Sequence, residues 1–265
     1  MTFAAPATST LSILPDPRTA VVTGAGGPAG IGRATARVLA EHGWHVALVD
    51  INAEGLAGVE AELRAAGHQH LLAVPTDTAS ESSVAQTFAL IDAELPPVVG
   101  LVNLAGIASQ ATLHECELEE FQRVMAVNVT GSYLMLRAAA ARMIPQGVGR
   151  IVNTSSITAF DGGGTFSKGV YATAKAAVIG MAHGGARELG PYGITVNVLA
   201  PGPVDTEIMG GQLSDERKAA MSAAIPLGRV GQPEEIAAAV AFLLSDGGGY
   251  LNGATLQIDG GKHMR

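Results

Sequence analysis

Short runs of β-branched and aliphatic residues alternate along this chain with longer, Ala-rich segments of helical periodicity. Seven runs are predicted strands, at residues 19–23, 45–50, 71–75, 100–105, 150–154, 195–200 and 255–258. Six segments between them are predicted helices, at residues 31–42, 53–66, 80–94, 117–143, 170–189 and 234–245. A helix between consecutive strands is the crossover that parallel strands need. The pattern therefore predicts an α/β fold, a doubly wound seven-stranded parallel sheet with helices on both faces.

The chain is predicted to form a single domain. Of its 265 residues 48% are hydrophobic, enough for a substantial core, and neither a repeat nor a low-complexity linker interrupts the alternation. We assign residues 18–265 to this domain and residues 1–17, rich in Pro, Thr and Ser, to a flexible N-terminal tail. Between residues 202 and 231 only a weak helix is predicted, at 214–224, so this stretch is expected to be a substrate lid.

Charge and composition argue against several classes of partner. The formal net charge of -8 disfavours nucleic acid, and no run of 18 apolar residues predicts a membrane span. A single cysteine, Cys116, rules out an intrachain disulfide framework and favours a reducing, cytoplasmic location. His68 and His70 lack a carboxylate or thiolate as third ligand, so no metal site is predicted.

A glycine-rich loop lies between the first predicted strand and the first predicted helix. It reads Thr23-Gly24-Ala25-Gly26-Gly27-Pro28-Ala29-Gly30-Ile31-Gly32. Glycines let the backbone turn sharply and approach a pyrophosphate, whose charge is met by free N–H groups and by the positive end of the helix dipole. The loop therefore predicts a dinucleotide site.

Asp50, at the end of the second predicted strand, lies 18 residues after Gly32. In doubly wound folds an acid here accepts hydrogen bonds from the ribose hydroxyls of the adenosine. A 2′-phosphate about 5 Å from this carboxylate would be repelled by several kcal/mol at an effective dielectric near 20. Neither Lys nor Arg follows at residues 51–53, so NAD is predicted in preference to NADP.

Tyr171 and Lys175 begin the Ala-rich segment 170–189, and their spacing of four places the phenol and the ammonium on one helix face. A free tyrosine titrates near 10, and a neighbouring cation lowers that pKa toward the range useful for proton transfer. Ser155 and Ser156 follow the strand 150–154, on the rim where parallel strands end. A hydroxyl there can donate to a carbonyl oxygen as charge develops on it.

Together these residues resemble the short-chain dehydrogenase/reductase family, over residues 18–261. The family's Rossmann fold binds NAD or NADP and transfers a hydride to or from a carbonyl or alcohol carbon. The resemblance rests on the loop, on Tyr171, Lys175 and Ser156, and on further matching residues. These are Asp77, Asn103-Leu104-Ala105-Gly106, Asn128 and Pro201-Gly202-Pro203-Val204-Asp205-Thr206.

The resemblance implies roles for the catalytic residues. Tyr171 would be the general acid/base and Ser156, as second serine of the pair, would orient the substrate oxygen. Lys175 would lower the tyrosine pKa and bind the nicotinamide ribose, and Asn128 would hold a water near that lysine.

The resemblance also implies a set of cofactor residues. Asp77 would meet the adenine, Asn103 and Ala105 would line the adenosine side, and Thr206 would contact the carboxamide. The full expected set is Thr23, Gly24, Gly30, Ile31, Gly32, Asp50, Asp77, Asn103, Ala105, Gly106, Tyr171, Lys175, Pro201, Gly202, Val204 and Thr206.

The chain departs from the family pattern in three places. Five residues instead of three separate Gly24 from Gly30, which leaves the loop's contacts open. Leu104 stands where the family often has asparagine, a position that braces the sheet. The segment from Ser156 to Tyr171 is about two residues longer than is usual in the family, at one edge of the substrate pocket.

These residues predict an NAD-dependent oxidoreductase that interconverts a secondary alcohol and a ketone. The alternatives are a 3-oxoacyl thioester reductase of the same family, which usually prefers NADPH, and a silent NAD-binding scaffold or sensor. Candidate pocket residues are Ser109, Gln110, Phe160, Phe166 and Met209, which suggest a small to medium, fairly apolar substrate. The pattern places no Arg to bind a carboxylate. The family resemblance implies a homotetramer or homodimer.

Overall fold

The protein is described by a computed structural model over residues 13–164, 167–206 and 214–264. Its seven strands form one sheet in the order β3-β2-β1-β4-β5-β6-β7, and all paired strands are parallel. This confirms the predicted doubly wound α/β sheet. The strands are β1 (Thr19–Thr23), β2 (His45–Asp50), β3 (Leu71–Pro75), β4 (Val98–Asn103), β5 (Gly149–Thr154), β6 (Ile194–Pro201) and β7 (Thr255–Ile258).

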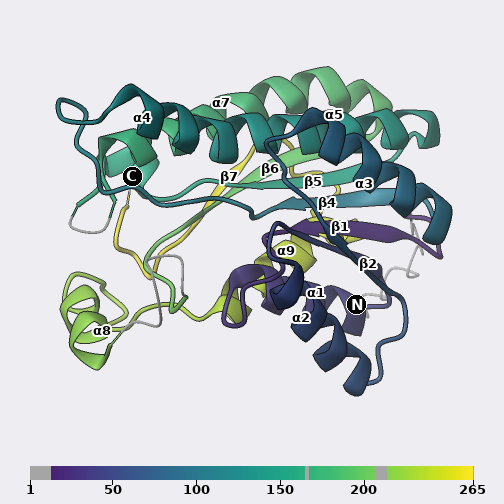
Figure 1. Ribbon diagram of the computed structural model, residues 1–265, viewed down its shortest axis with the longest axis horizontal. Helices are drawn as coiled ribbons and strands as arrows, with labels where there is room; N and C mark the ends of the chain where they lie inside the picture. Colours follow the sequence, from purple (N-terminus) through teal and green to yellow (C-terminus); the bar gives the residue numbers. More distant parts are fainter. Residues whose placement is uncertain (1–12, 165–166, 207–213, 265) are drawn as a thin grey trace, which may run out of the picture.

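Helices cover both faces of the sheet, as Figure 1 shows. One layer holds α1 (Ile31–Glu41), α2 (Ala53–Ala65) and α9 (Pro233–Leu244). The other holds α3 (Glu81–Glu94), α5 (Gly131–Met143) and α7 (Gly169–Leu189). Three shorter helices lie at the end where the strands point: α4 (Leu118–Met125), α6 (Thr158–Asp161) and α8 (Asp215–Ser222).

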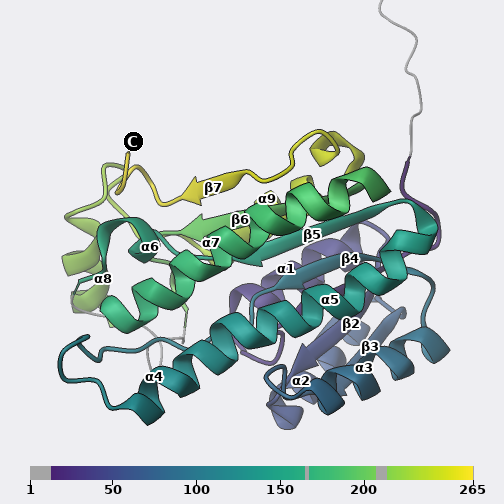
Figure 2. The ribbon, with the colours of Figure 1, turned by 90° about the horizontal axis from the view of Figure 1, so that it is seen from above.

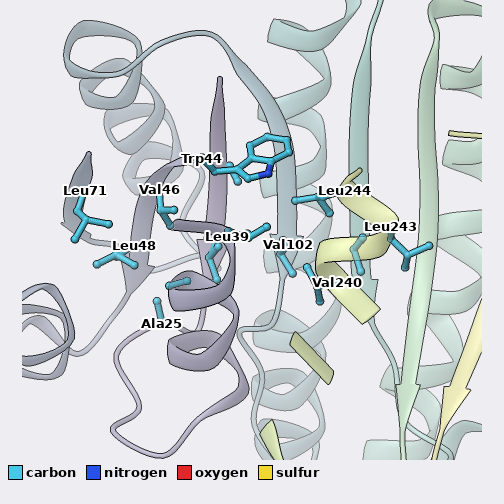
Figure 3. Packing of buried hydrophobic residues seen from close by; sticks show 14 of the residues in the cluster. Ala25, Leu39, Trp44, Val46, Leu48, Leu71, Val102, Val240, Leu243 and Leu244 are labelled. Atoms are coloured by element: carbon cyan, nitrogen blue, oxygen red, sulfur yellow. The ribbon is translucent and has the colours of Figure 1, made fainter. Parts of the chain in front are cut away.

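Successive residues of a strand feed two separate cores. Val21 packs with Phe88 and Met135 under α3 and α5. Val22, the next residue, faces the opposite layer, where Leu39 of α1, Trp44 of the following turn and Val240 of α9 pack together (Figure 3). Side chains of a strand alternate between faces, so a central strand buried on both sides needs a continuous apolar run. The unbroken apolar stretches that predicted the strands have this origin.

The predicted helix 117–143 is interrupted. A π-helical turn, Ala126–Thr130, separates α4 from α5. At its centre the Asn128 side chain donates to the carbonyl of Val124, and the Ser132 hydroxyl donates to the carbonyl of Asn128. These side chains compete for carbonyls that an α-helix pairs internally, which favours the wider turn. π-turns of this kind are frequent at functional sites.

The attached part of the chain begins earlier than the predicted domain start at residue 18. Residues 1–12 lie outside the described part of the chain. Leu14, predicted to lie in the tail, is buried against the first core, and the Ile13 N–H donates to the Asp246 carboxylate at 3.1 Å. The burial of Leu14 and this hydrogen bond attach residues 13 and 14 to the domain.

Within the described residues one helical stretch, Leu118–Gln146, is long and apolar enough to cross a membrane. It comprises α4, the π-turn and α5 with a short 3-10 turn. Leu134, Met135 and Met143 bury its apolar side in the second core, as expected for a core helix of a sheet protein. It is therefore no evidence for a membrane span.

Candidate active site

A cavity of about 900 Å³ opens at the carboxyl ends of the strands. The strand order runs outward from β1 to β3 on one side and from β4 to β7 on the other. The helices that follow β1 and β4 therefore lie on opposite faces of the sheet. Such a switch in strand order leaves a crevice, the usual ligand site of open α/β sheets. Predicted residues that line the cavity are Gly24, Gly30, Ile31, Gly32, Asp50, Asp77, Ala105, Gly106, Ser156, Tyr171, Lys175, Pro201, Gly202, Val204 and Thr206.

The glycine-rich loop has no room for a side chain at Gly24 or at Gly32. Gly24 has a φ of +70°, and a Cβ there would lie 3.0 Å from the amide nitrogen of Ala105. A Cβ on Gly32 would overlap the carbonyl oxygen of Gly24, so the first turn of α1 packs directly on the loop. No side chain caps α1, and Ile31 and Gly32 of its first turn line the cavity. The N–H groups at the uncapped N-terminus of α1 and the glycine backbone beside them fit a pyrophosphate, and side chains in place of Gly24 and Gly32 would fill this space.

Both oxygens of the Asp50 carboxylate are held by backbone amides. The Gly26 N–H donates to Oδ2 at 2.9 Å, and the Asn52 N–H donates to Oδ1 at 2.9 Å. Each oxygen keeps a lone pair for a second donor. The half-buried carboxylate lies at the cavity wall, oriented and able to accept hydroxyl groups.

Thr23 and Asn103 do not line the cavity, in contrast to their predicted role in cofactor contact. The buried Thr23 hydroxyl accepts the N–H groups of Leu104 and Ala105, at 2.9 and 3.0 Å. Asn103 donates to the Asn153 side chain at 2.8 Å and to the Ser132 carbonyl at 3.2 Å. These side chains fasten the ends of the strands. Thr23 and Asn103 therefore affect the site by holding the strand ends in place, and neither side chain reaches the cavity.

Tyr171 and Lys175 both lie on the first two turns of α7, and both side chains line the cavity while being largely buried. The Lys175 ammonium lies 5.5 Å from the centroid of the Tyr171 ring and donates to the Thr154 carbonyl at 2.9 Å. Burial raises the pKa of the Tyr171 phenol and lowers the pKa of Lys175 to about 8. In this environment the phenolate needs the lysine cation as its compensating charge.

The two serines after β5 have different partners. The buried Ser155 hydroxyl donates to the Lys175 carbonyl at 2.7 Å, which fastens α7 to the end of β5. Ser156 is half-buried, and its hydroxyl contacts the hydroxyl of Thr158 at 3.1 Å. A hydroxyl bonded to another hydroxyl can exchange partners at low cost, so Ser156 is the one suited to a ligand.

Asn128 is fully buried behind the cavity. Its amide donates to the carbonyls of Ile107 and Val124, while Oδ1 has no hydrogen-bond partner among the described residues. A Cβ placed on Gly106 would lie 2.6 Å from this Oδ1 and 3.3 Å from the Lys175 ammonium. The amide oxygen and the ammonium therefore converge on the same small space, and only a glycine leaves it open.

Lys175→Met should stabilise the protein at neutral pH. A lysine whose folded pKa is about 8 and whose unfolded value is 10.5 costs stability below pH 8. Between pH 8 and 10.5 the unfolded chain binds the proton while the folded chain does not, so wild-type stability recovers as pH rises. The advantage of the variant should shrink by about 2 kcal/mol between pH 7 and 9.5. Urea unfolding of both proteins at pH 7 and 9.5 measures this difference in unfolding free energy. A difference that does not change with pH would contradict a lowered pKa of the buried Lys175.

The substrate side of the cavity differs from the prediction. Ser109 is buried and donates to Glu120, Phe160 stacks on His263, and Gln110 is exposed away from the lining. Phe166 and Met209 lie outside the described residues. The lining also includes residues of α4 and α6, the loop before α7, α8 with the residues after it, and the C-terminal turn. These are Arg123, Asp161, Gly163, Gly164, Ser167, Ala220, Met221, Ala224 and Lys262.

Lys262 lies on a hydrogen-bonded turn at the cavity mouth. The Asp259 carboxylate accepts the N–H groups of Gly261 and His263, at 2.9 and 2.7 Å. In Figure 2 this C-terminal turn lies near α6 and α8, on the opposite side of the molecule from α4, which carries Arg123. Arg123 pairs with Glu120, whereas the exposed Lys262 ammonium has no partner within the described part of the chain. The sequence carried no signal for these residues, because only the fold brings them to the cavity.

The known proteins that this chain resembles are dehydrogenases and reductases. The model of the enoyl-(acyl carrier protein) reductase family matches residues 24–263. A cis-4-hydroxycyclohexanecarboxylate dehydrogenase from Sinomonas cyclohexanicum is 43% identical over 92% of this chain and 96% of its own length. The 3-oxoacyl-acyl-carrier-protein reductase FabG of Escherichia coli is 39% identical, over 92% and 97%. A short-chain type dehydrogenase/reductase from Mycobacterium marinum superposes with a TM-score of 0.88 at 33% identity, covering 95% and 97%.

Proposed function

The chain belongs to the short-chain dehydrogenase/reductase family and is an oxidoreductase using a nicotinamide cofactor; on that premise we propose that it interconverts a secondary alcohol and a ketone with NAD. One observation carries this proposal. Tyr171, Lys175 and Ser156 line the same cavity as Asp50 and the glycine-rich loop. A proton-transfer group and a dinucleotide cradle thus share a single space.

The residues of the cofactor end fit NAD. The loop from Gly24 to Gly32 and the N-terminus of α1 would receive the pyrophosphate, and Asp50 the adenosine ribose hydroxyls. Lys175 would bind the nicotinamide ribose. Bound NAD would supply the hydride acceptor. The negative charge of Asp50, with neither Lys nor Arg at residues 51–53, supports NAD over NADP.

The proposed acid/base group is Tyr171. In the oxidative direction its phenolate accepts the hydroxyl proton of the alcohol while the carbinol hydrogen leaves as hydride, so a ketone remains. Ser156 donates a hydrogen bond to the same oxygen and holds it near the phenol. The Lys175 cation stabilises the phenolate, which burial alone disfavours.

Asn128 is proposed to connect Lys175 to solvent. Its Oδ1 and the Lys175 ammonium converge on the space beside Gly106, where a bridging water would accept from the ammonium and donate to the amide oxygen. Proton exchange with solvent would then follow this route after each turnover.

Turnover tests the proposal as a whole. Purified protein is mixed with NAD or NADP and a panel of secondary alcohols, and absorbance at 340 nm is followed; the matching ketones and a 3-oxoacyl thioester are run with NADH and NADPH. We expect alcohol oxidation with NAD. Preferred reduction of the thioester would favour the reductase function of the FabG relative. No turnover despite NAD binding would favour a scaffold or sensor.

We further propose that the substrate carries a carboxylate bound by Lys262. The lining near α8 is apolar at Met221 and Ala224, and Lys262 offers an unpaired cation at its edge. The name of the 43% identical relative describes such a compound, an alicyclic ring with a hydroxyl and a carboxylate. A charge-assisted hydrogen bond across the ring would hold the carbinol carbon toward Tyr171.

Lys262→Met should lower kcat/KM about tenfold for 4-hydroxycyclohexanecarboxylate, in line with one partly exposed charge-assisted bond. The neutral 4-hydroxycyclohexanecarboxamide should be affected less than twofold. Lys168→Met is the control, because it removes the same charge at a lysine whose own side chain is not part of the cavity lining. Equal losses for acid and amide would refute a carboxylate contact.

The proposal includes a cytoplasmic location and assembly into two or four copies, as the family resemblance implies. Exposed apolar side chains are available for contacts between copies, among them Leu118 and Tyr133 along α4 and α5, and Tyr250 before β7.

A further inference from the structure

We propose that Gly55, a residue of α2 outside the cavity, is a positioning residue that sets the orientation of Asp50 and so the preference for NAD. It acts by seating the glycine-rich loop on the first turn of α2. The inference rests on the proposed NAD dependence and deepens it, since it names the element that holds the selecting carboxylate in place.

The loop and α2 are in direct contact. A Cβ on Gly55 would overlap the carbonyl oxygen of Gly26 and would lie 2.6 Å from Nδ2 of Asn52. Asn52 is the N-cap of α2, and its Oδ1 accepts the Gly55 N–H at 3.0 Å. Only a glycine lets the loop approach the helix this closely.

Gly26 transmits this contact to Asp50. It is buried, its N–H donates to Asp50 Oδ2 at 2.9 Å, and a Cβ on Gly26 would lie 3.0 Å from the Asp50 Cγ. The Asn52 N–H holds the other oxygen at 2.9 Å. The carboxylate is thus fixed between the loop on one side and the start of α2 on the other. Any shift of the loop away from α2 breaks one of its two fixed hydrogen bonds.

The residue that makes this contact lies within the longer part of the loop. Five residues lie between Gly24 and Gly30, and Gly26 is among them. Gly24, Gly27 and Gly30 line the cavity, whereas Gly26 is buried behind it against Asp50 and Asn52. The longer loop therefore reaches the end of β2 as well as the pyrophosphate cradle. Cofactor selection then depends on the position of the loop against α2 as well as on the charge of Asp50.

The same helix supplies a matched control. Gly58, one turn after Gly55, has open space where a Cβ would lie. Glycine is disfavoured inside helices, so Gly58→Ala should raise the Tm without touching the loop. Gly55→Ala adds the same methyl group to the same helix, but pushes against the Gly26 carbonyl.

Equilibrium binding of NADH and NADPH, followed by nicotinamide fluorescence, tests the inference without turnover. For Gly55→Ala we expect the Kd for NADH to rise at least tenfold and the Kd for NADPH to change less than threefold, which reduces discrimination. Gly58→Ala should match wild type for both. Wild-type values in Gly55→Ala would overturn the inference. Equal weakening of both cofactors would also overturn it, because the loop would then bind phosphate without affecting selection.

Gly26→Ala is the second variant if Gly55→Ala does not fold. Its Cβ meets Asp50 and Asn52 at 3.0 and 3.1 Å, a milder displacement of the carboxylate itself. We expect the same direction, with the NADH Kd raised at least threefold and the NADPH Kd nearly unchanged; unchanged discrimination would refute the inference. Wild-type protein that binds neither cofactor would instead refute the proposed function, so the two failures are distinguishable.

Discussion

Tyr171→Phe loses turnover by about 10³-fold while it binds NADH as tightly as wild type, if the proposed acid/base role is correct. The substitution removes one oxygen from a buried ring and leaves the ring packed on α7. Without the phenol no group at this position accepts the hydroxyl proton when the hydride leaves. Proton transfer by a positioned group is typically worth 10²- to 10⁴-fold in rate.

Two measurements separate chemistry from folding for this variant. NADH fluorescence titration should give the wild-type Kd, and 340 nm turnover should be lost. Tyr192→Phe is the control, because Tyr192 is half-exposed in the turn after α7 and lies outside the cavity lining. Retention of more than a tenth of wild-type turnover in Tyr171→Phe would refute the acid/base assignment.

Asp50→Asn reduces the preference for NAD over NADP by at least a hundredfold in kcat/KM. The amide keeps the shape of the side chain but removes the charge that a 2′-phosphate about 5 Å away would meet, a repulsion of several kcal/mol. Binding of NAD weakens as well, because a carboxylate accepts hydroxyl hydrogen bonds more strongly than an amide. Initial rates at 340 nm with both cofactors provide the ratio.

Asp77→Asn is the companion variant for Asp50→Asn. Asp77 also lines the cavity, and its Oδ1 accepts the Ala79 N–H at 2.9 Å, but it follows β3 rather than β2. Its charge should affect both cofactors alike. A ratio that stays constant in Asp50→Asn would mean that this carboxylate does not select the cofactor.

The fold could be predicted well because the sheet is buried on both faces. Four strands, β1, β2, β3 and β7, have the predicted bounds to the residue. All seven were located because short apolar or β-branched runs separated by helical segments are typical of a sheet covered on both faces. β4 was placed two residues late. Leu104 and Ala105 continue the apolar run, but their N–H groups bond to the Thr23 hydroxyl and leave the sheet. The local sequence does not show that these N–H groups bond to a side chain of β1 instead of to a neighbouring strand.

The site could be predicted in part. Tyr171 and Lys175 were found from their spacing on one helix, and Asp50 from its place at a strand end. The structure also gives Ser155 and Ser156 different hydrogen-bond partners, whereas the sequence left the choice between them to analogy. Met221 and Lys262 reach the cavity from segments distant in the sequence, and no local pattern around either residue indicates this position.

Hydride transfer from a labelled alcohol tests the central claim most directly. The protein is incubated with NAD and 4-hydroxycyclohexanecarboxylate deuterated at the carbinol carbon, and the reduced cofactor is analysed by mass spectrometry. We expect NADH that is heavier by one deuterium, formed together with the ketone, and formation slower by about 10³-fold with Tyr171→Phe. If no deuterated NADH forms from this alcohol or from panel alcohols deuterated at the carbinol carbon, the claim that this site oxidises secondary alcohols is contradicted.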